Sequence, residues 1–279
     1  MMRRLGPVVG CLAFLAGSVP ISAQPSWLIP DGRDRGRRSE REFPTVREVF
    51  PGNKFIFARV RYASWGGYWG WATDYPDSDL NFPIRLKELT TIDIEVDESG
   101  EPAHVVVDLT NRREMFKYPW LYLIEPGRLI FSEEEARNLR EYLLKGGFLH
   151  VDDFWGEAEW ANFQREFEKV FSPEDYPIRP IPLEHELFHI VFELTEIPQV
   201  PSIHHWMSTG LTYERWDAQE PRCLGVSDPN GRLMTVITHN TDLGDGWERE
   251  GENQEYFREF SAKKAYPLGI NIVVYAMTH

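Results

Sequence analysis

Two apolar segments joined by a strongly capped helix constrain the fold of this chain most. Trp120–Ile124 has the sequence WLYLI and residues 148–151 have the sequence FLHV, both of strand length. Between them, Ser132 and the three glutamates after it form a capping box that opens a helix, and Gly146 with Gly147 closes it. Strands that are apolar on both faces and are separated by a helix usually lie parallel inside a covered sheet. This segment therefore predicts an α/β fold with a largely parallel sheet.

Further segments extend the same pattern. Residues 54–62 (KFIFARVRY) alternate like a strand, and residues 157–170 carry aromatic and apolar side chains on one helical face. Residues 222–226 and 233–238 flank the turn sequence Asp-Pro-Asn-Gly, which predicts an antiparallel hairpin. We therefore expect a three-layer α/β/α sandwich with a mostly parallel sheet plus an antiparallel hairpin at its edge.

Composition divides the chain into three parts. Residues 1–23 place Arg3 and Arg4 before an apolar stretch that ends in small residues, which is typical of a cleaved signal peptide. We expect export to the periplasm or secretion, and no membrane span after cleavage; the alternative is that this segment stays as an anchor. Residues 24–45 are polar and rich in turn formers, so we expect a flexible linker. Residues 46–279 are expected to form a single α/β domain.

The charge and cysteine content narrow the classes of partner. The 279 residues carry a formal net charge of −14, and the pI is near 5.1. This balance argues against a nucleic-acid partner, because phosphate binding needs a basic patch. After signal cleavage only Cys223 remains, so an internal disulfide cannot form and an ordinary core must stabilise the domain.

An aromatic and acidic segment follows the first predicted strand. Residues 64–82 have the sequence SWGGYWGWATDYPDSDLNF, in which tryptophans and glycines precede several aspartates. Buried aspartates without partners are unfavourable, so this composition indicates a surface that meets a ligand or a partner. The end of the segment also predicts a short helix over residues 79–89, capped by Ser78 and with Pro83 in its first turn. Some of these aspartates are then caps rather than binding groups.

Two further polar clusters follow predicted strands. Asp152 and Asp153 come directly after the strand at residues 148–151, and residues 239–248 (HNTDLGDGWE) follow the strand at residues 233–238. Ligands of parallel α/β sheets meet the carboxyl ends of the strands. Both clusters are therefore candidates for ligand binding, and the alternatives are a helix cap for the first and a self-bonded surface loop for the second.

The string His185-Glu186-Leu187-Phe188-His189 matches the H-E-x-x-H pattern of zinc hydrolases. Nearby prolines and the absence of a long amphipathic helix disfavour zinc binding. His185 and His189 are thus weak metal candidates. The alternative is that His185 caps a turn and His189 bonds locally.

We expect these clusters to form one cleft for a small polar or carbohydrate-like ligand, with tryptophans as stacking surfaces. The candidate ligand-binding residues are Trp71, Asp74, Tyr75, Asp79, Asn81, Asp152, Asp153, His185, His239, Asn240, Asp242, Asp245, Trp247 and Glu248. No catalytic residue is assigned and no cofactor is predicted, with a divalent cation left open. Two alternatives remain: a metal-assisted hydrolase that uses Asp and His, and a cell-envelope module that binds an envelope protein through an exposed aromatic patch.

Several motifs together resemble a known family. Five segments are similar to the bacterial domain-of-unknown-function family 4159, over about residues 54–279: residues 71–82, residues 119–156, the H-x-x-x-H segment at residues 185–189, NTDLGDGWE and the terminal LGINIVVYAMTH. That family resembles a branch of the class I glutamine amidotransferase-like fold, near trehalose-utilisation-type proteins. The resemblance implies a three-layer α/β/α sandwich. It does not imply glutamine hydrolysis, because residues 152–154 occupy the place of the catalytic Cys elbow and contain no Cys.

Overall fold

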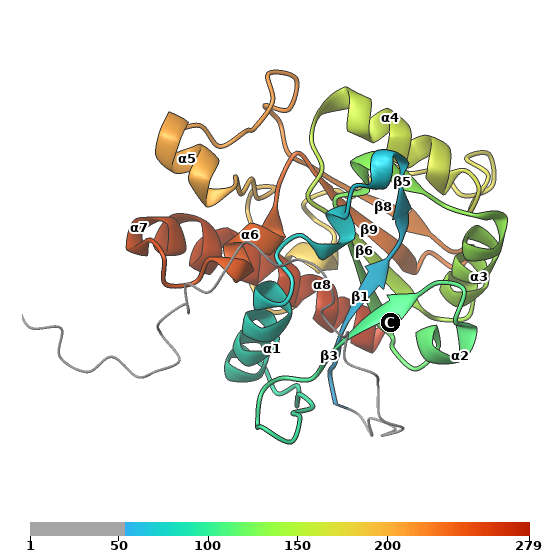
Figure 1. Ribbon diagram of the computed structural model, residues 1–279, viewed down its shortest axis with the longest axis horizontal. Helices are drawn as coiled ribbons and strands as arrows, with labels where there is room; N and C mark the ends of the chain where they lie inside the picture. The colour runs from blue at the N-terminus through green and yellow to red at the C-terminus, as the bar shows by residue number, and fades with distance from the viewer. Residues whose placement is uncertain (1–53) are drawn as a thin grey trace, which may run out of the picture. The chain divides into compact units, whose positions relative to one another are not determined.

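The computed structural model describes residues 54–279 (Figure 1). The predicted signal peptide (residues 1–23), the predicted linker (residues 24–45) and the first eight residues of the predicted domain (residues 46–53) therefore lie outside the described residues. Seven strands form one sheet in the order β3-β1-β4-β6-β9-β8-β7. Their bounds are β1 (Phe57–Arg61), β3 (His104–Asp108), β4 (Trp120–Ile124), β6 (Phe148–Asp152), β7 (Arg179–Pro180), β8 (Arg222–Ser227) and β9 (Leu233–His239). A small second sheet pairs β2 (Ala63–Ser64) with β5 (Leu129–Ile130) antiparallel.

The mostly parallel sheet is confirmed, and so is the hairpin. The five strands β3, β1, β4, β6 and β9 are parallel, and β8 runs antiparallel to β9. The hairpin is not a simple addition to the edge, however. Its strand β9 pairs with β6 in parallel and is buried along its whole length, while β8 lies between β9 and the short β7.

Helices cover both faces of the sheet (Figure 1). α1 (Asp77–Leu89) and α8 (Tyr266–Thr278) pack on one face, and α3 (Glu133–Leu144) and α4 (Gly156–Phe167) pack on the other. The strands alternate between these layers: Trp120 of β4 joins the α1 and α8 side, whereas its neighbour Leu121 joins the α3 and α4 side. A strand with two buried faces is mostly apolar, which explains the WLYLI sequence.

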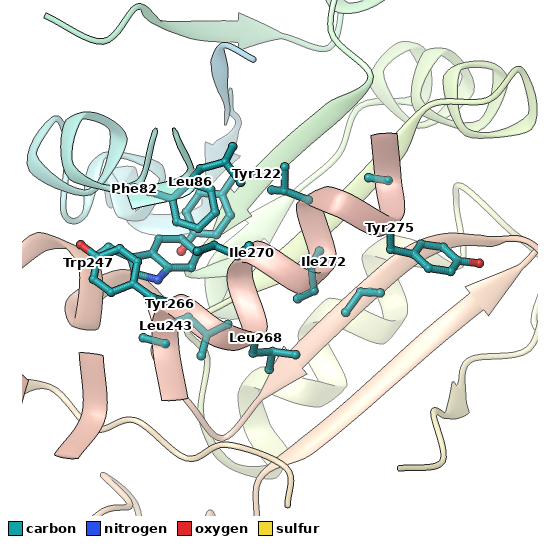
Figure 2. Close-up of a cluster of buried hydrophobic side chains, with 14 of the residues drawn as sticks. Phe82, Leu86, Tyr122, Leu243, Trp247, Tyr266, Leu268, Ile270, Ile272 and Tyr275 are labelled. Carbon is teal, nitrogen blue, oxygen red and sulfur yellow. The ribbon is translucent and has the colours of Figure 1, made fainter. Parts of the chain in front are cut away.

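Trp247 belongs to the core rather than to a binding surface. It lies on α6 (Leu243–Glu248), is fully buried, and its ring centroid is 4.5 Å from that of Phe82 on α1 (Figure 2). Gly269 on α8 lets this helix approach, because a Cβ there would lie 2.5 Å from the Trp247 ring. The predicted stacking role of Trp247 is therefore wrong: the indole fills the space between three helices.

The remaining elements are short. They are α2 (Arg112–Met115), α5 (Ile203–Thr209), α7 (Gln254–Tyr256), a π-helical stretch at Phe257–Ala265 that continues into α8, and 3-10 turns at Trp65–Gly67, Gly70–Ala72, Pro126–Arg128 and Glu186–Phe188. In the part of the chain that the structure describes, no helix has the length and apolar character needed to cross a membrane.

The start of α1 differs from the sequence prediction. The helix begins at Asp77, so Ser78 lies inside it and Pro83 is in its interior rather than in its first turn. The Ser78 amide donates to the carbonyl of Asp74, which starts the helical turn two residues earlier than expected. Instead of capping, the Ser78 hydroxyl accepts a hydrogen bond from Arg59.

Candidate functional site

A cavity of about 430 Å³ lies where β4, β6 and β9 end. We call it the acidic cavity, because seven carboxylates and three arginines line it, for a formal net charge of −4 (3 − 7). Its lining residues are Tyr68, Thr73, Asp74, Glu125, Gly127, Arg128, Asp153, Trp155, Glu159, Ser202, Glu214, Arg215, Asp242, Asp245 and Arg249. This is the edge of the sheet at which parallel α/β proteins bind ligands.

Strained backbone surrounds this cavity. Within residues 54–279, four residues other than glycine have a left-handed φ: Asp74 (60°), Glu125 (49°), Asp153 (54°) and Asn240 (61°). The first three line the cavity, and Glu125, Asp153 and Asn240 each follow the end of a strand. Such conformations are unfavourable by about 1 kcal/mol or more and are concentrated at functional sites. The strain therefore supports a binding or catalytic role for this edge.

Asp152 anchors the floor of the site and does not line the cavity. Its carboxylate accepts hydrogen bonds from the hydroxyls of Tyr122 (2.9 Å) and Thr238 (2.6 Å) and from the amides of Leu243 (3.0 Å) and Gly244 (3.1 Å). Burial raises the pKa of Asp152 to about 6, although these bonds oppose the rise. The residue joins the end of β6 to the start of α6.

Asp153 directly follows the end of β6 and lines the cavity. Its Oδ1 accepts a hydrogen bond from Trp155 Nε1 at 3.1 Å. Burial, followed by repulsion from Glu125, Asp74 and Glu214, raises the pKa of Asp153 well above its usual value. Neither aspartate caps α4, so the predicted capping alternative is wrong for this pair.

Asp242 comes from the turn between β9 and α6, and Asp245 comes from the first turn of α6. Asp242 caps α6 by accepting from the Asp245 amide at 2.7 Å. Asp245 accepts from the Ile203 amide (2.8 Å) and the Tyr256 hydroxyl (2.9 Å), which ties the start of α5 and α7 to the cavity wall. Burial raises the pKa of both carboxyls, and for Asp242 repulsion from Asp153 adds to the rise.

Arg59 positions the loop that carries Asp74. This fully buried arginine on β1 forms an ion pair with Asp79, with Nε 3.0 Å from the carboxylate, and donates to the carbonyls of Trp71 (3.2 Å) and Thr73 (2.8 Å). Asp79, predicted as a ligand-binding residue, is therefore the structural partner of Arg59. The loop between Trp71 and α1 is held so that Asp74 reaches the cavity.

Asp74 also meets two acids from α6. Among the described residues, Asp74, Asp245 and Glu248 each place a carboxylate oxygen within 4.8 Å of the others. Burial, followed by repulsion from Glu248 and Asp245, raises the pKa of Asp74 well above its usual value. Asp74 Oδ2 is buried and receives no hydrogen bond. We call these three residues the carboxylate triad.

A second hollow of about 440 Å³, the aromatic pocket, shares Tyr68 with the acidic cavity. Its lining residues are Arg61, Tyr62, Ala63, Ser64, Gly67, Tyr68, Trp69, Trp71, Asp108 and Glu135. The rings of Trp69 and Trp71 stack with centroids 6.1 Å apart, and Trp69 is 61% exposed whereas Trp71 is 4% exposed. The loop at residues 65–71 therefore carries both an exposed aromatic side chain, as predicted for a patch that binds a partner, and the lining of a pocket.

The two histidines of the H-E-x-x-H string lie away from the cavity. The string forms a 3-10 turn at Glu186–Phe188 rather than an α-helix. His185 Nδ1 accepts from the Leu187 amide at 3.1 Å, and His189 Nε2 donates to the Leu183 carbonyl at 2.6 Å. These contacts match the alternative of a turn cap and a local hydrogen bond, and the helix that a zinc site would need is not formed.

His239 and Asn240 hold the start of α4 and do not face the cavity. His239 Nε2 donates to the Gly156 carbonyl (3.2 Å), and its Nδ1 accepts from Arg222 Nε (2.9 Å). Burial and the charge of Arg222 lower the pKa of His239 to about 3, so the ring is neutral. Asn240 Oδ1 accepts from the Gly156 amide at 2.9 Å, and its Nδ2 donates to the Glu220 carbonyl at 2.9 Å.

The structure therefore brings together only part of the predicted site. Asp74, Asp153, Asp242 and Asp245 line one cavity, and Glu248 joins it through the carboxylate triad. The other predicted residues lie elsewhere: Trp71, Tyr75, Asp79, Asn81, Asp152, His185, His239, Asn240 and Trp247. Among these, the Tyr75 hydroxyl lies 3.3 Å from His104 Nε2, and Asn81 donates to the Trp247 carbonyl at 2.9 Å, so both have local structural contacts.

The sequence analysis missed several lining residues. Glu125 directly follows the apolar strand Trp120–Ile124, so the same strand-end reasoning that selected Asp153 would have found it. Glu214 comes from an irregular segment after α5 and has no recognisable pattern around it. Its position in the cavity depends on the path of that segment. The Ser202 amide donates a hydrogen bond to the Glu214 carboxylate at 2.6 Å and so fixes this position.

These features define an α/β-sandwich domain with an acid-lined cavity at the carboxyl edge of its parallel sheet. The family described as "Domain of unknown function (DUF4159)" matches residues 56–277, and the chain belongs to this family. The predicted family is thereby confirmed. A search of the curated proteins found no match.

Proposed function

We propose that this domain binds a small polyhydroxylated ligand of the carbohydrate class that carries no negative charge. The observation that carries the proposal is the convergence of seven carboxylates from distant parts of the chain on one cavity at the carboxyl edge of the sheet. Carboxylates accept short, strong hydrogen bonds from hydroxyl donors. A ring of acceptors therefore suits a ligand that presents many hydroxyl groups.

The charge of the cavity restricts the class of ligand. The arginines of the lining already have acidic or aromatic partners: Arg215 pairs with Glu159, and Arg128 lies 4.9 Å from the ring centroid of Trp65. The remaining field is negative, so phosphates, nucleotides and acidic sugars are repelled. Neutral saccharides and amino sugars are compatible with it.

The aromatic pocket extends the proposed site. Tyr68 lines both hollows, so a ligand longer than one sugar ring can pass from the acidic cavity to Trp69. The exposed face of Trp69 offers an apolar surface for the C–H face of a sugar ring. The Gly66 and Gly67 backbone has positive φ and nothing within 4 Å of either Cβ position, which leaves this loop room to adjust to a ligand.

Hydrolysis of the bound saccharide is a second candidate function, and the raised pKa of Asp153 supports it. Glycoside hydrolysis needs one carboxylic acid kept protonated to donate to the leaving group and a second carboxylate near it. Burial and neighbouring acids raise the pKa of Asp153, and Glu125 lines the same cavity. If this candidate is right, the wild-type protein releases reducing ends from a bound oligosaccharide and Asp153→Asn does not; no release leaves binding as the sole role.

We also propose that this domain has the class I glutamine amidotransferase-like fold and has lost the catalytic Cys of that fold. The support for this placement is the left-handed Asp153 between β6 and α4, at the position where the resemblance expects a Cys elbow. Cys223 is buried on β8, and burial raises its pKa to about 12, so it does not replace the nucleophile. Export to the periplasm, or secretion, is the accompanying expectation from residues 1–23.

Calorimetric titration with a panel of neutral, amino and acidic oligosaccharides tests the proposal. We expect heat of binding for neutral or amino members, none for acidic members, and weaker binding by Asp153→Asn. Glu134→Gln, which removes an exposed carboxylate on α3 outside the cavity, is the matched control and should bind like the wild type. Preference for the acidic saccharides, or equal binding by Asp153→Asn, would show that the cavity is not the site.

A further inference from the structure

We propose that the carboxylate triad of Asp74, Asp245 and Glu248 is a binding site for a hard divalent cation such as Ca²⁺. The triad borders the acidic cavity from the loop before α1 and from α6. Its role in ligand recognition rests on the proposed saccharide binding, whereas its occupancy by a cation does not.

The geometry of the triad suits one ion. One oxygen from each carboxylate lies within 4.8 Å of the other two. Ca²⁺ binds oxygen ligands at about 2.3–2.6 Å, so two ligands on opposite sides of the ion are at most about 5 Å apart. Three oxygens at this mutual spacing can therefore contact a single cation without a large movement of the chain.

A buried oxygen without a donor is the independent sign of a missing partner. Asp74 Oδ2 is shut off from solvent and receives no hydrogen bond from any described residue. A buried acceptor in that state is unfavourable and requires an explanation such as an ion. The backbone of Gly244 lies so close that an added Cβ would be 2.6 Å from this oxygen, which leaves little room for a larger donor on that side.

The local charge balance points to a divalent ion. Arg249 is the cation in contact with the triad among the described residues: its Nε lies 2.7 Å from Glu248 and 3.7 Å from Asp245. The other nearby guanidinium, Arg59, is already paired with Asp79. Three carboxylates against one arginine leave a formal charge of −2 (1 − 3), which one divalent cation neutralises.

The ligand types select the class of metal. The triad offers only carboxylate oxygens, the ligands of hard cations, and none of the imidazole or thiolate groups that favour zinc. Three protein ligands leave further coordination positions for water. On the side of the acidic cavity these positions are open to the hydroxyl groups of a bound saccharide, because Asp74 and Asp245 both line that cavity.

Titration of the full chain, freed of metal with a chelator, with CaCl₂ and MgCl₂ in a calorimeter tests this site. We expect saturable binding of one ion per chain. Asp74→Asn and Glu248→Gln should each weaken the affinity at least tenfold, since even residues that only orient metal ligands contribute about 10- to 100-fold. Glu134→Gln on α3 should bind like the wild type. Affinity should rise with pH, because protons on the triad must leave before the cation binds.

Absence of saturable binding of either ion by the wild-type chain, or unchanged affinity in both triad variants, would overturn the site. Thermal unfolding of the metal-free variants guards against misfolding. Asp74→Asn removes a repelling charge, so its melting temperature should equal or exceed that of the metal-free wild type. Glu248→Gln also loses the contact with Arg249, so it should still unfold in one cooperative transition, close to the melting temperature of the metal-free wild type. Saccharide titrations with and without CaCl₂ keep the two proposals apart. Ca²⁺ binding without saccharide binding refutes only the proposed function, and the reverse refutes only the cation site.

Discussion

Replacing Arg59 by methionine should destabilise the domain more than any other single charge removal on β1. The guanidinium and its partner Asp79 are both fully buried, and the same group donates to Ser78 Oγ at 2.7 Å and to the carbonyls of Trp71 and Thr73. Methionine fills much of the volume, but it leaves the Asp79 carboxylate without its charged partner and the carbonyls of Trp71 and Thr73 without the guanidinium donor.

The size of the effect follows from burial. Breaking a buried ion pair by removing one partner is unfavourable by about 3–5 kcal/mol, because a charge is left in a site of low polarity. For a domain whose free energy of unfolding is about 5–15 kcal/mol, this is a third of the stability or more. Arg61, two residues along the same strand, pairs with Asp108 with side chains 39% and 40% exposed, and Arg61→Met should be unfavourable by at most about 1 kcal/mol.

Urea denaturation monitored by tryptophan fluorescence measures both free energies of unfolding. The double variant Arg59→Met/Asp79→Leu provides a further control, because replacing both charges by apolar groups should recover most of the loss. The reasoning is refuted if Arg59→Met is no more destabilising than Arg61→Met. It is also refuted if the double variant is less stable than Arg59→Met alone.

Three further outcomes follow from the acids and the exposed aromatic ring. Burial raises the pKa of Asp152 to about 6, so the folded state holds its proton more tightly than the unfolded state. Metal-free protein should therefore lose stability as pH rises through 6, and urea titrations at pH 4 and pH 8 should differ by about 2 kcal/mol from Asp152 alone. Asp153→Asn keeps an acceptor for Trp155 and a residue that tolerates a left-handed φ, and it removes a buried charge that neighbouring acids repel. At pH 8 the variant should therefore have a free energy of unfolding about 1 kcal/mol higher than the wild type, and it should bind the ligand more weakly. A lower melting temperature of the variant in calorimetry would contradict the raised pKa of Asp153. Trp69→Ala should change stability by less than about 0.5 kcal/mol, because this ring is exposed, yet weaken saccharide binding about two- to tenfold; unchanged binding would remove Trp69 from the site.

Most of the sheet could be predicted from local sequence. Continuous apolar strands, a capping box and a turn sequence act over a few residues, and the structure confirms Trp120–Ile124, the Ser132 cap and the β8–β9 hairpin. The position of β9 inside the sheet could not be predicted, because strand order depends on pairing between distant segments. The start of α1 was also missed, since the contact between Ser78 and the distant Arg59 replaces the expected cap.

Only those residues of the candidate site that come soon after a strand could be predicted from the sequence. Asp153 and Asp242 follow strands and do reach the cavity, and Glu125 could have been found in the same way. Composition alone could not show that Asp79 is structural whereas Asp74 lines the cavity. The ion-pair partner of Asp79 is the buried Arg59, which lies about 20 residues away on another element. His239 looks like a binding residue in the sequence, but both of its ring nitrogens have structural partners.

The most direct test of the central claim is a crystal structure of the protein grown with the saccharide that binds best in the calorimetric panel. The account predicts electron density for the sugar in the acidic cavity, with hydroxyl groups bonded to Asp153 and Asp242 and a ring reaching Trp69 past Tyr68. Density for the sugar on another face of the domain, with the acidic cavity filled by water alone, would contradict it.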